Sequence, residues 1–90
     1  MRFCYVYVLY SHKDRRFYIG FTENLKKRYE EHQQRKVFST APRLPIELIF
    51  YEAYRNKYDA LRREKYLKSS KGKTTLKSML REFISNIPIA

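Results

Sequence analysis

The feature that most constrains this chain is the segment from Phe3 to Tyr10, FCYVYVLY, in which apolar or aromatic residues occupy both alternating sets of positions. Because successive residues of a β-strand point to opposite faces of a sheet, this segment predicts a strand that is covered on both sides. A polar stretch separates it from Phe17-Tyr18-Ile19-Gly20, a short second strand that we expect to end at its glycine. The two segments therefore predict an antiparallel hairpin.

A helix, a loop and a third strand are expected after the hairpin. Thr22 can cap a helix that runs to about Arg35. Two prolines interrupt regular structure and bound a connecting loop over residues 36–45. Residues 46–54, IELIFYEAY, have the composition of a strand.

Two more helices are expected to complete the chain. Asn56 can cap a helix over residues 57–69, and Gly72 is expected to end it in the left-handed conformation. A last helix carries an apolar stripe from Leu76 to Ile87. The element order β-β-α-β-α-α predicts an α+β fold in one domain over residues 1–90, with a three-stranded, largely antiparallel sheet flanked by helices.

Charge indicates the class of partner. Twenty Lys and Arg residues against nine Asp and Glu residues leave a net charge of +11. Such a basic surface favours nucleic acid, over the alternatives of anionic lipid or solubility alone. No apolar run is long enough to span a bilayer, the N-terminus lacks a signal-peptide pattern, and the single cysteine suits a reducing compartment. We therefore expect a cytoplasmic protein that does not associate with membranes.

Glu64 interrupts the apolar stripe of the second predicted helix. The stripe is formed by Ala60, Leu61 and Leu67. Burying an unpaired charge is costly, so this carboxylate is expected to meet a cation. The cation is either a basic side chain, such as that of Lys68 four residues later, or a bound metal ion.

Four further side chains are candidates for chemistry. Arg28 and His32 lie four residues apart on the inward-facing edge of the first predicted helix. Arginine binds phosphate through two hydrogen bonds and histidine can transfer a proton, although both also occur as structural residues. Tyr7 and Tyr18 occupy the hairpin strands, where they either pack together or direct their hydroxyls into a shared pocket.

Together these residues resemble the GIY-YIG nuclease family. Tyr7 is followed eleven residues later by Tyr18-Ile19-Gly20, Arg28 lies ten residues after Tyr18, His32 follows four residues later, and Glu64 lies within ALRREKYLKS. The resemblance covers nearly the whole chain, and the element order matches that fold. Within the family, the chain looks most like the small, stand-alone members that are similar to the amino-terminal domain of the excinuclease C subunit.

The resemblance implies a metal-dependent endonuclease that hydrolyses phosphodiester bonds of DNA, with a structure- or damage-directed role in DNA repair or recombination. By that resemblance, Glu64 would bind one divalent cation, Mg²⁺ or Mn²⁺, and Tyr7 would be the general base toward the attacking water. Tyr18 would position the water or the scissile phosphate. Arg28 would neutralise the developing charge, with His32 assisting through a hydrogen bond or proton transfer.

The chain departs from the family pattern in its first tripeptide, which is Tyr5-Val6-Tyr7 in place of Gly-Ile-Tyr. Asn86 is the candidate for the asparagine that many members carry near the end of the domain. The basic residues expected to contact the nucleic-acid backbone are Lys26, Lys27, Arg35, Lys65, Lys68, Lys71 and Lys73.

Several alternatives to this interpretation stay open. The chain could be a non-catalytic nucleic-acid-binding module, or an adaptor subunit of a larger assembly. A protein partner could supply specificity. No base-reading motif distinguishes RNA from DNA, so the type of nucleic acid is also open.

Overall fold

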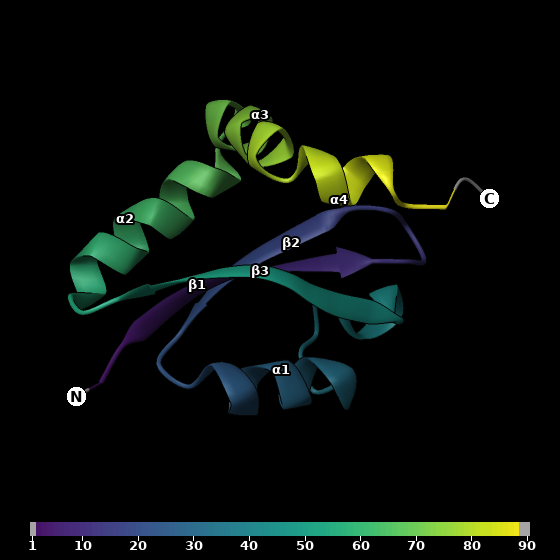
Figure 1. Ribbon diagram of the computed structural model, residues 1–90. Helices are drawn as coiled ribbons and strands as arrows, with labels where there is room; N and C mark the ends of the chain where they lie inside the picture. The colour runs from purple at the N-terminus through teal and green to yellow at the C-terminus, as the bar shows by residue number, and fades with distance from the viewer. Residues whose placement is uncertain (1, 89–90) are drawn as a thin grey trace.

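The computed structural model describes residues 2–88 of the chain. The elements are β1 (Cys4–Ser11), β2 (Phe17–Thr22), α1 (Leu25–Gln33), the 3₁₀ helix η1 (Ala41–Arg43), β3 (Ile46–Tyr54), α2 (Lys57–Lys68), α3 (Ser70–Met79) and α4 (Arg81–Ser85). The three strands form one antiparallel sheet in the order β2-β1-β3. Helix α1 lies on one side of the sheet, and α2, α3 and α4 lie on the other (Figure 1). The α+β fold predicted from the sequence is confirmed. No helix in the described part is long and apolar enough to cross a membrane.

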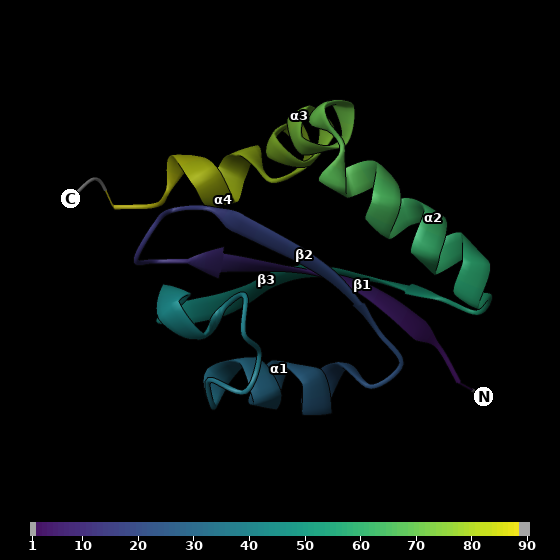
Figure 2. The same cartoon turned by 180° about the vertical axis from the view of Figure 1, so that it is seen from behind.

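Strand β1 is the central strand and is buried on both faces. On one face Val6 and Val8 belong to a core completed by residues of α2 and α3. On the other face Tyr7 and Leu9 belong to a second core with Ile46 and residues of α1. Figure 2 shows the sheet between these two helical layers from behind. Full burial of an aliphatic side chain of this size contributes about 1.5–3 kcal/mol, so β1 holds both layers to the sheet.

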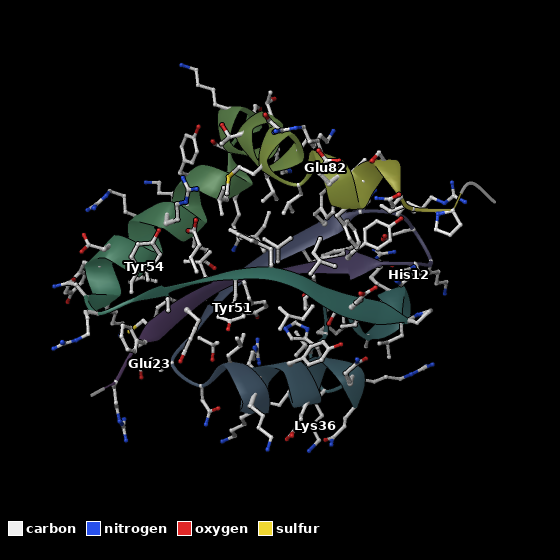
Figure 3. All side chains as sticks on the ribbon, viewed as in Figure 1. His12, Glu23, Lys36, Tyr51, Tyr54 and Glu82 are labelled. Carbon is white, nitrogen blue, oxygen red and sulfur yellow. The ribbon has the colours of Figure 1, made fainter. Side chains whose placement is uncertain are left out.

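Helix α2 is also tied to the sheet by polar contacts. Arg63 donates two hydrogen bonds to the Glu52 carboxylate of β3, from Nε at 2.9 Å and from Nη2 at 3.2 Å. Tyr54 donates a third to the same carboxylate, at 2.8 Å. Figure 3 shows Tyr54 on the α2 side of β3 and Tyr51 on the α1 side. The two Arg63 bonds tie α2, the helix that carries Glu64, to β3, and the Tyr54 bond holds the Glu52 carboxylate.

Strand β2 is longer than the sequence predicted, and this moves the start of α1. Gly20 does not end the strand, because it pairs with Tyr7 and the strand continues to Thr22. The prediction that Thr22 caps α1 is therefore wrong. The cap is Asn24, whose Oδ1 accepts a hydrogen bond from the Lys27 backbone N–H at 3.1 Å.

The end of α1 and the loop after it also differ in detail. The helix ends at Gln33 instead of about Arg35, because Arg35 has a φ of 62°, outside the right-handed helical region. The loop that follows contains η1, with Pro42 in its first turn. Proline is tolerated there because the first N–H groups of a helix have no intrahelical partner.

The role predicted for Gly72 is wrong. No glycine among the described residues has a positive φ, and Gly72 lies in the first turn of α3, where its N–H donates to the Ser69 cap at 3.1 Å. A β-carbon at this position would lie 1.7 Å from the Tyr66 carbonyl oxygen. Glycine is required here because α3 starts in close contact with the end of α2, and not because the chain turns left-handed.

The apolar stripe predicted for one last helix is divided between α3 and α4. The chain leaves the helical conformation at Leu80, with φ −105° and ψ 22°. Leu76 is fully buried, and Phe83 of α4 packs edge-on against Tyr10, with ring centroids 5.6 Å apart. Met79 is 40% exposed. Both short helices thus still cover the sheet, but not every stripe residue is buried, since Met79 at the end of α3 is exposed.

Replacing Gly72 with alanine is expected to lower the free energy of unfolding by about 1–3 kcal/mol, because the added β-carbon would overlap the Tyr66 carbonyl oxygen. Helix propensity alone predicts the opposite sign, since alanine is favoured over glycine by about 1 kcal/mol in a helix. Urea unfolding followed by circular dichroism measures the change, with the exposed neighbour variant Lys71→Ala as control. A Gly72→Ala protein at least as stable as the wild type would contradict the packing argument.

Candidate active site

A pocket of about 670 Å³ runs along β2, which is an edge strand of the sheet. Consecutive residues from Phe17 to Phe21 form its floor, α1 and the following loop form one wall, and α2 and α3 form the other. The residues that the sequence suggested for catalysis or metal binding all line this pocket. They are Tyr7, Tyr18, Arg28, His32 and Glu64. The pocket is therefore the candidate site, and it joins side chains from both faces of the sheet.

The Tyr7 side chain lies over Gly20. The two residues are directly paired between β1 and β2. A β-carbon at position 20 would lie 2.3 Å from the Tyr7 hydroxyl oxygen. The tyrosine ring thus occupies the space that any other side chain at this position would fill, and its hydroxyl reaches His32 Nε2 at 2.9 Å.

His32 is buried in the wall of the pocket, with both ring nitrogens hydrogen-bonded. Nε2 bonds with the Tyr7 hydroxyl, and Nδ1 bonds with the Thr40 hydroxyl at 2.7 Å. Burial, and next the positive charge of Arg28, lower the pKa of His32 to about 4. The imidazole is therefore neutral at neutral pH.

Arg28 lies four residues before His32 on α1, and its positive charge acts on the imidazole. Hydrogen bonding to Tyr7, and also to Glu31, raises the pKa of the Arg28 guanidinium above its ordinary value. The Glu31 contact joins Nη1 to Oε1 at 3.3 Å. Arg28 therefore keeps its charge at every pH of interest and offers hydrogen-bond donors to the pocket.

Tyr18 is engaged by a carboxylate that the sequence did not point to. Its hydroxyl donates a hydrogen bond to Asp14 Oδ2. Burial, and then this contact, raise the pKa of Tyr18. Burial also tends to raise the pKa of Asp14, but hydrogen bonds from Tyr18 and the Arg16 backbone, with the charge of Arg43, hold that pKa below its ordinary value. Tyr18 thus stays protonated, and its oxygen can still accept a hydrogen bond from the pocket.

Glu64 faces the pocket from α2. Its side chain is 19% exposed, and Oε2 lies 3.1 Å from Lys68 Nζ. The lysine partner that the sequence allowed is therefore present, and the carboxylate is also directed toward the candidate site. The described residues contain no group of three or more His, Cys, Asp or Glu side chains that could hold a metal ion. A single carboxylate suits Mg²⁺, which keeps several waters and shares its remaining positions with substrate phosphates.

The predicted backbone contacts separate into two groups. Lys68 and Lys73 line the pocket. Lys26 and Lys27, near the start of α1, line two other pockets. The remaining residues of the prediction are exposed and do not line the candidate site: Arg35, Lys65 and Lys71.

Other polar residues of the region were missed from the sequence. Arg16, Thr40 and Arg43 line the pocket, and Arg43 Nε lies 3.5 Å from Asp14 Oδ2. They come from the hairpin turn and the loop around η1, where no periodicity marks a site. Asn86, by contrast, follows α4 and donates to the Glu82 carbonyl oxygen at 2.8 Å, and it does not line the pocket.

Comparison with known proteins adds to this geometry. The family model described as the GIY-YIG catalytic domain matches residues 3–77, a range that includes every residue of the pocket. A UPF0213 protein of Limosilactobacillus reuteri is 43% identical over 67 residues, which are 71% of this chain and 69% of that protein. A UPF0213 protein in the ldhD 5′ region of Pediococcus acidilactici is 37% identical over 76 residues, 81% of this chain and 76% of that protein. The solution NMR structure of a UPF0213 protein from Bacillus halodurans superposes with a TM-score of 0.54 at 33% identity, covering 88% of this chain and 85% of that one.

The lowered pKa of His32 predicts a loss of stability in acid. Folding lowers this pKa from 6.5 to about 4, so between these values the unfolded chain binds a proton that the folded protein does not. The free energy of unfolding therefore falls as the pH drops through this window, by up to about 1.4 kcal/mol per pH unit.

Urea unfolding at a series of pH values measures this slope. The His32→Gln variant is expected to lose the component that His32 contributes, whereas the control variant His12→Gln, at a side chain that is 43% exposed, keeps it. An identical pH dependence in the wild type and His32→Gln would show that His32 does not titrate as described.

Proposed function

The chain belongs to the GIY-YIG family of nuclease domains, and on that basis we propose that it is a divalent-metal-dependent endonuclease that hydrolyses phosphodiester bonds of DNA. The observation that carries the proposal is the convergence of Tyr7, Tyr18, Arg28, His32 and Glu64 on one pocket. These side chains come from β1, β2, α1 and α2. A purely structural role would not require them to meet at one concave edge of the sheet.

Tyr7 is the general base of the proposed reaction. Its side chain lines the pocket, and its hydroxyl lies beside two groups that can donate hydrogen bonds, His32 and Arg28. Such donors stabilise negative charge on an oxygen. Tyr7 would first release its hydroxyl proton to solvent through the pocket, and its oxygen would then take the proton of the attacking water. Tyr18, whose hydrogen is directed to Asp14, would accept a hydrogen bond that orients the water or the phosphate.

Glu64 would hold the divalent cation, with water and a substrate phosphate oxygen as the other ligands. When bound, the cation supplies neutralisation of the phosphoryl and leaving-group charge. Arg28 contributes a permanent positive charge to the same phosphate. Lys68, whose Nζ lies 3.1 Å from Glu64 Oε2, would contact the neighbouring backbone phosphate.

The electrostatics of the pocket favour a polyanionic substrate. Basic side chains around it outnumber the one acidic side chain, Glu64. These basic residues are Arg16, Arg28, Arg43, Lys68 and Lys73. Contacts of this kind hold a nucleic-acid backbone without reading its sequence.

Recognition of the backbone is the basis of a finer proposal. We infer that the substrate is selected by its structure or by damage, as in DNA repair or recombination. A protein that contacts only the DNA backbone can still distinguish the shape of the DNA, although it does not read the base sequence. We place the activity in the cytoplasm and in one nuclease domain over residues 1–90. The extent of the family match, residues 3–77, supports the single domain.

Cleavage of labelled DNA tests the proposed activity. Purified protein is incubated with linear, nicked, branched and single-stranded DNA in the presence of Mg²⁺, Mn²⁺ or EDTA. Metal-dependent cutting is expected, and Glu64→Gln and Tyr7→Phe are each expected to reduce its rate by about 10²-fold or more, because they remove the metal ligand and the general base. Matched controls are Glu82→Gln on α4, labelled in Figure 3, and Tyr58→Phe, whose side chains are exposed.

Two outcomes would contradict the proposal. Cutting that persists in Glu64→Gln at the wild-type rate would exclude Glu64 as the metal ligand. Salt-sensitive binding without cutting of any substrate would favour a non-catalytic nucleic-acid-binding module.

A further inference from the structure

The hydrogen bonds of the candidate site continue along the wall of the pocket to a buried threonine. Tyr7, His32 and Thr40 are 4%, 3% and 1% exposed and form a continuous line through both imidazole nitrogens. Thr40 lies in the loop before η1, and its own backbone is held on both sides. Its N–H donates to the Val37 carbonyl oxygen at 3.2 Å, and its carbonyl oxygen accepts from the Arg43 N–H at 2.8 Å. The position of the Thr40 hydroxyl is thus set by the loop.

A neutral imidazole has one protonated nitrogen, which donates, and one bare nitrogen, which accepts. The line of hydrogen bonds can therefore run in two directions. In the first, Tyr7 donates to Nε2 of His32, and Nδ1–H donates to Thr40. In the second, Thr40 donates to Nδ1, and Nε2–H donates to the oxygen of Tyr7.

The two directions differ in which hydroxyl hydrogen is left without a protein acceptor. Within residues 2–88 the Thr40 hydroxyl has one hydrogen-bond partner, His32 Nδ1. In the first direction that nitrogen is the donor, so the Thr40 hydrogen is buried without an acceptor, which is unfavourable. In the second direction Nδ1 accepts the Thr40 hydrogen, and the hydrogen without a protein acceptor is that of Tyr7, whose hydroxyl lies over Gly20 in the floor of the pocket and can donate there to solvent or substrate.

We propose that Thr40 is a positioning residue whose hydroxyl holds His32 in the Nε2–H tautomer, so that His32 donates a hydrogen bond to the Tyr7 oxygen. This inference rests on the proposed function, in which Tyr7 is the general base. Tyr7 releases its own hydroxyl proton to solvent through the pocket and then takes a proton from the attacking water. His32 keeps its Nε2 proton throughout and stabilises the charge on the Tyr7 oxygen, so it is not the proton acceptor.

The tautomer can be measured without any nuclease activity. Long-range ¹H–¹⁵N correlation spectra at neutral pH distinguish a protonated from a bare imidazole nitrogen. For His32 we expect a protonated Nε2 and a bare Nδ1. A wild-type spectrum with the proton on Nδ1 would overturn the inference, and this result does not depend on whether the protein cuts DNA.

Variants of Thr40 test the link to catalysis. Thr40→Val keeps the shape of the side chain and removes the hydroxyl, so we expect loss of the Nε2–H preference and cleavage at least tenfold slower. Thr40→Ser retains the hydroxyl and is expected to restore both properties. Thr74→Val, at an exposed threonine of α3, serves as the control.

The results separate the two proposals. A Thr40→Val protein that keeps both the Nε2–H tautomer and the wild-type rate would overturn the role of Thr40. If Thr40→Val does not fold, the wild-type spectrum and the rate of Thr40→Ser decide: a bare Nδ1 with retained cleavage supports the inference, and a protonated Nδ1 overturns it. If the wild type cuts no DNA, the proposed function fails, whereas the spectrum still decides the tautomer.

Discussion

Burial of β1 on both faces is the constraint on which the rest of the structure depends. Val6 and Val8 hold α2 and α3 on one side of the sheet, and Tyr7 and Leu9 hold α1 on the other. Residues on the two helical layers are therefore kept apart by the sheet, and they can meet only around an edge strand. Strand β2 is such an edge. The order of the strands thus explains why a pocket lined by residues of both layers lies at an edge of the sheet.

In that pocket, the neutral hydrogen-bonded side chains are buried in the wall, whereas the basic side chains are more exposed. Gly20 leaves room for the Tyr7 ring, whose hydroxyl begins a buried line of neutral groups that continues through His32 to Thr40. Burial and the charge of Arg28 keep His32 uncharged. The cations face the pocket itself, where a phosphate would lie. This separation avoids an unpaired buried charge and still presents positive charge to a substrate.

Local patterns explain what the sequence could predict. The doubly apolar segment that forms β1 and the Asn56 cap of α2 depend on neighbours in the chain, and both were predicted correctly. Gly72 was misinterpreted because glycine serves both as a left-handed cap and where two backbones approach closely, and only the three-dimensional contact with Tyr66 distinguishes these uses. Thr22 is a plausible cap in the sequence, but in the structure it belongs to β2, where it pairs with Tyr5.

The candidate site shows the same limit. Tyr7, Arg28 and Glu64 could be selected because their spacing resembles that of a known family. Thr40 lies in an irregular loop, and only its three-dimensional contact with His32 identifies it as part of the site. Nothing in the residues around position 40 indicates that contact, since it depends on how the loop folds back over α1.

The central claim is that the pocket along β2 binds the divalent cation through Glu64. Paramagnetic broadening by Mn²⁺ of the amide resonances of ¹⁵N-labelled protein tests it most directly. The account predicts that broadening is strongest around Glu64 and along Tyr18–Phe21 of β2, and that Glu64→Gln abolishes it. Broadening centred elsewhere, for example at the exposed His12–Glu47 pair, or unchanged in Glu64→Gln, would contradict it.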